Sequence, residues 1–165
     1  MKPLIAALCL GTFAWAQMPA EHQHPTNPDV HHDTVMKHGE QGMGFSQTST
    51  THHFLSDAQG GVIQVEAKDA KDAETKDQIR MHLGHIAKSF ADGDFDIPMF
   101  VHDTKTVPGV ADMQRLKGAI TYKFVETKNG GRVQMASQDP AAIAAVHQFL
   151  RFQIEEHRTG DPLPK

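Results

Sequence analysis

The chain has 165 residues, with 16 Lys and Arg against 20 Asp and Glu, giving a net charge of −4 when histidine is neutral. This mildly acidic balance, with no basic cluster, makes nucleic acid and anionic membrane surfaces poor partners. The only cysteine is Cys9, so the chain after it has no thiolate metal site, covalent haem attachment or cysteine nucleophile. The 12 histidines make imidazole the most abundant chemically versatile side chain.

Residues 1–16 have the pattern of a secretory signal peptide. Lys2 precedes an apolar run, and Ala14-Trp15-Ala16 forms a small-residue cleavage site before Gln17. The apolar run is too short to cross a bilayer, so we expect a soluble periplasmic or secreted protein with no membrane anchor after cleavage. Residues 17–30, rich in Pro, His and Asn, are expected to form a mobile tail.

An internal repeat appears when the chain is compared with itself at an offset of 70 residues. Identical pairs between positions 32 and 78 include His32/His102, Thr51/Thr121 and Phe54/Phe124. About a quarter of these positions match, against roughly 6% expected by chance from average composition. We interpret residues 31–165 as one domain built from two duplicated repeats, 31–94 and 101–161.

Each repeat predicts two strands followed by a helix. Residues 49–69 and 119–139 are each two extended runs joined by a turn ending in Gly-Gly, and glycine supplies the positive φ of hairpin turns. We expect Asp69 and Asp139 to start the helices, and Gly93 and Gly160 to end them. Apolar stripes mark the buried helix faces: Ile79, Leu83, Ile86 and Phe90 in the first, and Ile143, Val146, Leu150 and Ile154 in the second.

These patterns predict an α+β fold of duplicated ββα units. The two hairpins would form one antiparallel sheet, with the two long helices on one face. The exposed edge strands of such a small sheet make a homodimer plausible.

The paired His52 and His53 are separated by strand alternation. His52 shares a side with Phe54, which is repeated as Phe124, so we expect it to face the helices while His53 faces outward. The second repeat has Tyr122 in place of His52, which indicates that the scaffold does not require imidazole there.

Further histidines found only in the first repeat could meet His52. His82 and His85 are i, i+3 neighbours on the first helix, and His38 lies just before the first hairpin. Met43, Met81 and Met99 add thioethers, which are ligands suited to Cu(I) in an exported protein without thiols. We predict a metal site made from His52, His82, His85, His38 and Met81, with copper as the favoured ion.

Other histidines have structural interpretations. The repeated His-Asp-Thr at 32–34 and 102–104 is more typical of a turn than of a site. We expect His157, near a helix C-terminus, to sit where positive charge is favourable.

The favoured function is metal buffering, delivery or sensing outside the cytoplasm. Zinc in place of copper, and non-covalent haem with one axial histidine against Phe45, Phe54 and Phe90, are alternatives. An enzyme with a histidine base is a further alternative, although no nucleophile motif, H-E-x-x-H or phosphate loop is present. The last is a partner-binding module with incidental histidines.

Overall fold

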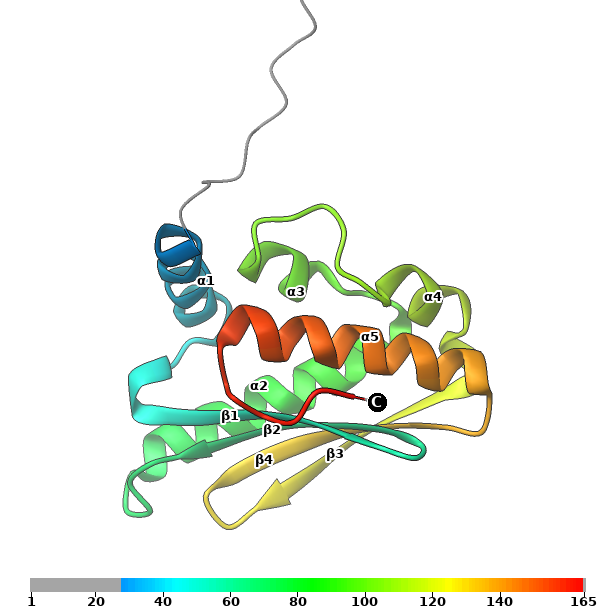
Figure 1. Cartoon of the computed structure of the whole chain (residues 1–165). Coiled ribbons are helices and arrows are strands. Elements are labelled where there is room, and N and C mark those ends of the chain that lie inside the picture. Colours follow the sequence, from blue (N-terminus) through cyan, green and yellow to red (C-terminus); the bar gives the residue numbers. More distant parts are fainter. Residues whose placement is uncertain (1–27, 165) are drawn as a thin grey trace, which may run out of the picture.

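The computed structural model describes residues 28–164, which form an α+β fold. This part of the chain contains five α-helices and one four-stranded antiparallel sheet (Figure 1). The predicted α+β class and its single antiparallel sheet are therefore confirmed. The signal peptide and residues 17–27 of the predicted tail lie outside the described residues. The elements are α1 (Pro28–Met43), η1 (Gln47–Ser49), β1 (Thr50–Asp57), β2 (Gly60–Ala67), α2 (Ala73–Asp92), α3 (Asp96–Val101), α4 (Val110–Arg115), η2 (Lys117–Ala119), β3 (Ile120–Thr127), β4 (Gly130–Ser137) and α5 (Pro140–His157).

The sheet has the strand order β1-β2-β4-β3, with β1 and β3 at its edges. Each predicted hairpin forms, and the two join through β2 and β4, where Ile63 lies opposite Val133. Each hairpin turn has only two residues, 58–59 and 128–129. Both pairs of glycines therefore begin the second strand of their hairpin and do not form the turn.

Close packing explains the glycines better than turn geometry does. Gly61 has a φ of +156°, and a Cβ there would lie 2.2 Å from the Leu55 carbonyl oxygen. A Cβ on Gly130 would lie 2.3 Å from the Val65 carbonyl oxygen, although no positive φ is needed at that position. We expected glycine at all four positions because of positive φ angles in the turns. Close approach of neighbouring backbone is the further reason that this expectation lacked.

The helix boundaries match the sequence patterns at two of four positions. Asp139 caps α5 through the Ala141 N–H, with proline at the first helical position, and left-handed Gly93 ends α2, as predicted. The N-cap of α2 is Asp72 and not Asp69, because the Asp72 side chain accepts the Thr75 N–H. Arg158, with a φ of +51°, ends α5 before Gly160.

The core joins both helices to the sheet. The predicted α2 stripe is buried throughout, and in α5 Ala142, Ala145 and Phe149 are buried in addition to most of the predicted stripe. Phe90 and Phe95 stack with ring centroids 4.3 Å apart, and both meet Phe149 edge-on. These aromatic contacts bind α2, α5 and the start of α3 into one core.

The helices contact the sheet in a crossed arrangement. Helix α2, which follows the first hairpin, contacts mainly β4 and β3, while α5 contacts mainly β1 and β2. Side chains show the same pattern: Leu150 of α5 lies against Gly61, and Leu83 of α2 lies against Gly131. Consequently, the C-terminal half of α5 and β1 are neighbours although they are distant in sequence.

The two His-Asp-Thr segments have different conformations. His32 lies inside α1, whereas His102 is the C-cap of α3 and Asp103 has a φ of +46°. The expected turn therefore occurs at 102–104 only. Helix α1 begins at Pro28, inside the segment expected to be a mobile tail.

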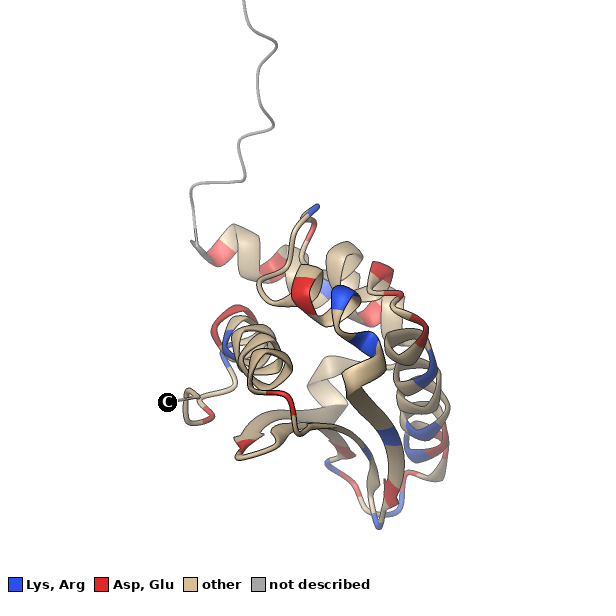
Figure 2. Ribbon diagram, turned by 90° about the vertical axis from the view of Figure 1, so that its right-hand side faces the viewer, with Lys and Arg blue, Asp and Glu red and all other residues tan. Residues whose placement is uncertain are grey.

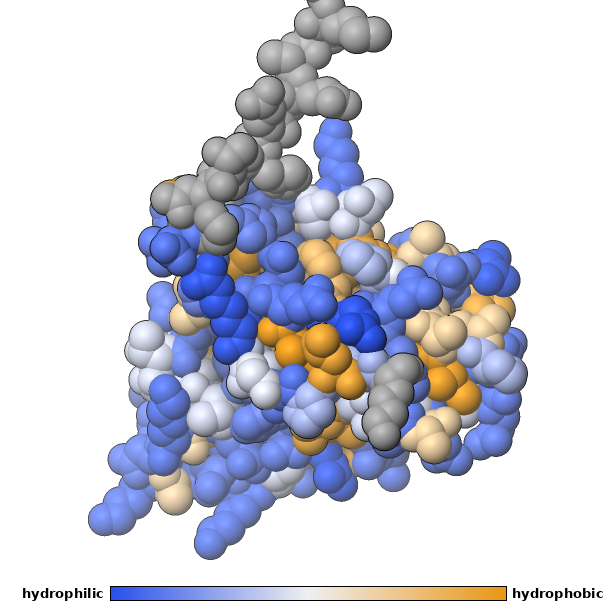
Figure 3. All heavy atoms as spheres, viewed as in Figure 1, coloured by the Kyte–Doolittle hydropathy of each residue, from blue (hydrophilic) through white to orange (hydrophobic). Residues whose placement is uncertain are grey.

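The surface of the described region is mainly polar. Charges of both signs lie along α2 and near the hairpin turns (Figure 2), and the face seen in Figure 3 is largely hydrophilic with a small apolar area near its centre. No helix within residues 28–164 is both long and apolar enough to span a bilayer.

Candidate functional site

A cavity lies between the sheet and the helices, with a volume of about 70 Å³. Strands β1 and β2 form one wall, and α2 and α5 form the sides. Helices α1 and α3 complete the lining with Gly39, Met43, Ile97, Pro98 and Val101 and leave the cavity partly open to solvent. Most of its surface is apolar, but four histidines reach it: His52, His82, His102 and His157. Four imidazoles gathered in a mostly apolar cavity are unusual for a protein interior.

His52 comes from β1 and faces the helices together with Phe54, which agrees with strand alternation. Its Nε2 lies 3.4 Å from Sδ of Met43, at the end of α1. Its ring stacks on Phe45 with centroids 6.3 Å apart. Burial lowers the pKa of His52 to about 4, and repulsion from His82 adds to this effect.

His82 comes from α2, on the edge of the buried stripe. Its ring meets Phe45 edge-on at a centroid distance of 5.7 Å. Burial, helped by repulsion from His85, lowers the pKa of His82 to about 4. Both His52 and His82 are therefore neutral near pH 7, which is the form of imidazole that binds metal ions.

His157 was not predicted as a site residue, and the expectation about its charge was wrong. Its ring is parallel to that of His52 with centroids 6.3 Å apart, and it meets Phe54 at 5.4 Å. Burial, followed by repulsion from His102 and His52, lowers the pKa of His157 well below its ordinary value. Desolvation thus outweighs the helix dipole here. The sequence does contain a signal for the burial of His157: it lies seven residues after Leu150 and therefore extends the buried stripe of α5.

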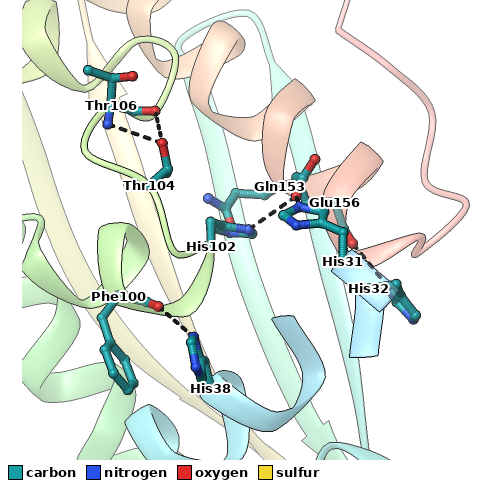
Figure 4. A network of polar contacts seen from close by, with 9 residues as sticks. All are labelled: His31, His32, His38, Phe100, His102, Thr104, Thr106, Gln153 and Glu156. Carbon is teal, nitrogen blue, oxygen red and sulfur yellow. Dashed lines mark hydrogen bonds and ion pairs between the residues drawn. The ribbon is translucent and has the colours of Figure 1, made fainter. Parts of the chain in front are cut away.

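His102 links the cavity to the surface through α5. It is fully buried, and its Nε2–H donates to Oε1 of Gln153 at 3.1 Å. Its Nδ1 lies 3.6 Å from Oε2 of Glu156, which also bonds to Nε2 of His31 on α1 (Figure 4). Burial lowers the pKa of His102, although Gln153 and Glu156 oppose the shift. The His102 and His157 rings meet edge-on with centroids 5.0 Å apart.

The structure brings together only part of the predicted set. His52 and His82 line the cavity, whereas His85 is exposed on α2 near Ser89, and Met81 is 74% exposed. His38 stacks on Phe100 and bonds to its carbonyl oxygen, outside the cavity (Figure 4). The thioether beside His52 belongs to Met43 and not to Met81.

His53 lies on the opposite side of β1 from His52, as alternation predicts. Its Nδ1 lies 2.9 Å from Oδ1 of Asp161 in the C-terminal segment. This contact gives His53 a structural role at the sheet edge.

The donor set limits the ions that the cavity could hold. Within residues 28–164, no three or more His, Cys, Asp or Glu side chains are placed to hold a metal ion together. A site at His52 and His82 must therefore use a different third ligand, and the Met43 thioether is the one adjacent to it.

Comparisons of this chain with protein-family models, with curated proteins and with solved structures gave no match. The function must therefore be inferred from the chemistry of the cavity.

Proposed function

We propose that this protein binds one Cu(I) ion through His52, His82 and Met43. The observation that carries the proposal is the 3.4 Å separation of His52 Nε2 and Met43 Sδ inside a cavity that His82 also lines. With metal–nitrogen and metal–sulfur bonds of about 2.0 and 2.3 Å, the law of cosines gives an angle of about 104° at a shared ion. The two atoms are thus spaced as ligands of one metal.

The ligand types favour Cu(I) over zinc. Zinc sites in proteins are almost always four-coordinate and built from His, Cys, Asp and Glu. Four histidines line the cavity, but within residues 28–164 no three such side chains are placed to hold one ion, and the proposed site has two imidazoles, His52 and His82, with a thioether. A thioether is a soft ligand and selects Cu(I). The apolar wall formed by residues such as Ile63, Val65 and Leu83 also keeps water from a monovalent ion.

Haem fits this cavity less well than a copper ion. A volume of about 70 Å³ is well below the roughly 300–1,000 Å³ of pockets that enclose drug-sized ligands. Binding a porphyrin would require α1 or α3 to move away.

We also infer that the site arose in one half of a duplicated chain. Two duplicated ββα units would form the sheet and place both long helices on its buried face. The reciprocal contacts of α2 and α5 with the two hairpins support this inference. The copper ligands belong to the first unit, since Tyr122 stands where the first unit has His52. Buffering, delivery or sensing of copper in the periplasm or outside the cell is the proposed role.

Competition for Cu(I) against a chromophoric chelator, under anaerobic reducing conditions, tests the proposal. The chain from Gln17 onward, with His22 and His24 replaced by Ala to remove tail ligands, should bind one ion per molecule. His52→Ala and Met43→Leu should each weaken binding at least tenfold, whereas the exposed control variants His85→Ala and Met81→Leu should not. Absence of saturable binding, or equal losses in the control variants, would contradict it.

A further inference from the structure

A line of imidazoles leads away from the proposed copper site. It runs from His52 to His157, then to His102, and ends at Glu156 and His31. Glu156 and His31 expose 23% and 27% of their side chains, whereas His102 is fully buried. The line thus connects the cavity with the surface where α1 meets α5. Figure 4 shows its outer end, with His102, Glu156 and His31.

We infer that His157 and His102 form a relay that passes the copper ion between the surface pair, Glu156 and His31, and the buried ligands. This inference rests on the proposed function. It assigns a purpose to two histidines that the site itself does not use.

The spacing of the rings suits transfer from one ligand to the next. An imidazole-bound ion lies about 2.0–2.1 Å from nitrogen, and therefore about 3.2 Å from the ring centre. Two rings can share one ion only if their centroids are no more than about 6.4 Å apart, which is twice that distance, and if a nitrogen of each ring points at the ion. The separations of 6.3 Å between His52 and His157, and 5.0 Å between His157 and His102, are both within this distance. Because the first pair of rings is parallel and the second pair is edge-on, each transfer also includes rotation of an imidazole about its side-chain bonds.

The chemistry of the rings also suits an intermediate carrier. Nδ1 of His102 and Nδ1 of His157 are buried and have no hydrogen-bond partner. Between histidines each transfer forms one Cu–N bond as another breaks, and at the surface end a Cu–N bond to His102 replaces a Cu–O bond to Glu156, so no transfer needs an oxidant or a reductant. Each relay step offers the ion fewer ligands than the site formed by His52, His82 and Met43, so the ion is held more firmly at its destination than on the way.

The surface end has a charge suited to capturing a cation. Glu156 supplies a carboxylate 3.6 Å from His102 Nδ1, and His31 supplies an imidazole in contact with the same carboxylate oxygen. An ion arriving there is within reach of His102 without first crossing the apolar wall.

Stopped-flow transfer of Cu(I) from a coloured chelator complex tests the relay, using the chain that begins at Gln17 with tail histidines replaced. His157→Phe, which keeps an aromatic ring against Phe54, should slow loading at least tenfold and leave the equilibrium affinity within twofold. Glu156→Gln, at the partly exposed end, should also slow loading without changing affinity. His85→Ala serves as the matched control.

The possible outcomes separate the relay from the copper site. Unchanged loading in both variants overturns the relay and leaves the copper site intact. A large loss of affinity in His157→Phe also overturns the relay, because it would make His157 a ligand. Failure of the parent protein to bind copper removes the proposed function itself. If His157→Phe does not fold, as judged by circular dichroism, Glu156→Gln decides the matter.

Discussion

Keeping the buried imidazoles uncharged costs the folded protein free energy at acid pH. A histidine that is neutral in the fold but protonates readily when unfolded makes stability depend on pH. His52 and His82 both have a pKa lowered to about 4, from an ordinary value of 6.5. Between these values the unfolded chain binds more protons than the folded one. The free energy of unfolding must therefore fall as the pH falls from about 6.5 towards 4.

This linkage predicts a measurable acid sensitivity. Lowering the pH from 7 to 4.5 should cost on the order of 2 kcal/mol for each of the two imidazoles, allowing for partial solvent access. Urea unfolding of the metal-free protein at a series of pH values measures this cost. His52→Phe should reduce the pH dependence strongly, whereas His85→Phe, on the exposed side of α2, should reduce it much less, because it removes only the repulsion that His85 adds to the burial of His82. Parallel pH profiles for the parent and His52→Phe would contradict the prediction.

The orientation of His52 could be predicted because strand alternation is a local property. It depends only on the period of two and on Phe54 being buried. The partnership of His52 with Met43 and His157 could not be predicted in this way. Those contacts depend on where α1 ends and on which hairpin α5 covers, and both are set by long-range packing.

The two hairpins show how tightly the strands are held against the helices. Gly61 lies between the Leu55 carbonyl and Leu150 of α5, and a Cβ there would approach their atoms to 2.2 and 2.6 Å. Gly84, in the middle of α2, is different, because a Cβ added there would meet nothing within 4 Å beyond its own helix backbone. The same substitution should therefore have opposite effects at these two glycines.

Gly61→Ala should lower the free energy of unfolding by about 2 kcal/mol or more, since both the backbone and Leu150 must shift. Gly84→Ala should raise it by about 0.5–1 kcal/mol, because alanine favours the helix and meets no obstacle. Urea unfolding of the two variants beside the parent measures both effects. A stabilised Gly61→Ala would show that α5 and β1 leave room for a methyl group between them.

The helices illustrate the limit of reading the elements from sequence. Local signals predict that both long helices exist, that Asp139 caps α5 and that Gly93 ends α2. All of these predictions are confirmed. The apolar stripe predicted for α5 did not include Phe149, because this residue lies one position away from the predicted stripe. Phe149 is nevertheless in the interior, where it meets Phe90 and Phe95. No local signal states which hairpin a helix will cover. The crossed contacts of α2 and α5 arise from the order β1-β2-β4-β3, which only the complete sheet determines.

The whole molecule must also protect the edges of its open sheet. The C-terminal segment crosses beside the edge strand β1 (Figure 1), where Oδ2 of Asp161 accepts the backbone N–H of Phe54 at 2.9 Å. Asp161 also contacts His53 and accepts from the Thr159 hydroxyl. Burial alone would raise the pKa of Asp161, but these hydrogen bonds outweigh it and lower the pKa. An edge donor that would otherwise be available to another chain is thereby occupied.

Removing this carboxylate should expose the edge. Asp161→Ala should destabilise the fold by about 1–3 kcal/mol, because a charged acceptor is lost and the Phe54 N–H is left without its partner. It should also increase concentration-dependent self-association, measured by sedimentation velocity, because β1 could then pair with a second chain. Asp112→Ala, which removes an exposed carboxylate from α4, controls for the change in net charge. If Asp161→Ala is destabilised yet associates no more than this control, the C-terminal segment stabilises β1 without protecting it from other chains.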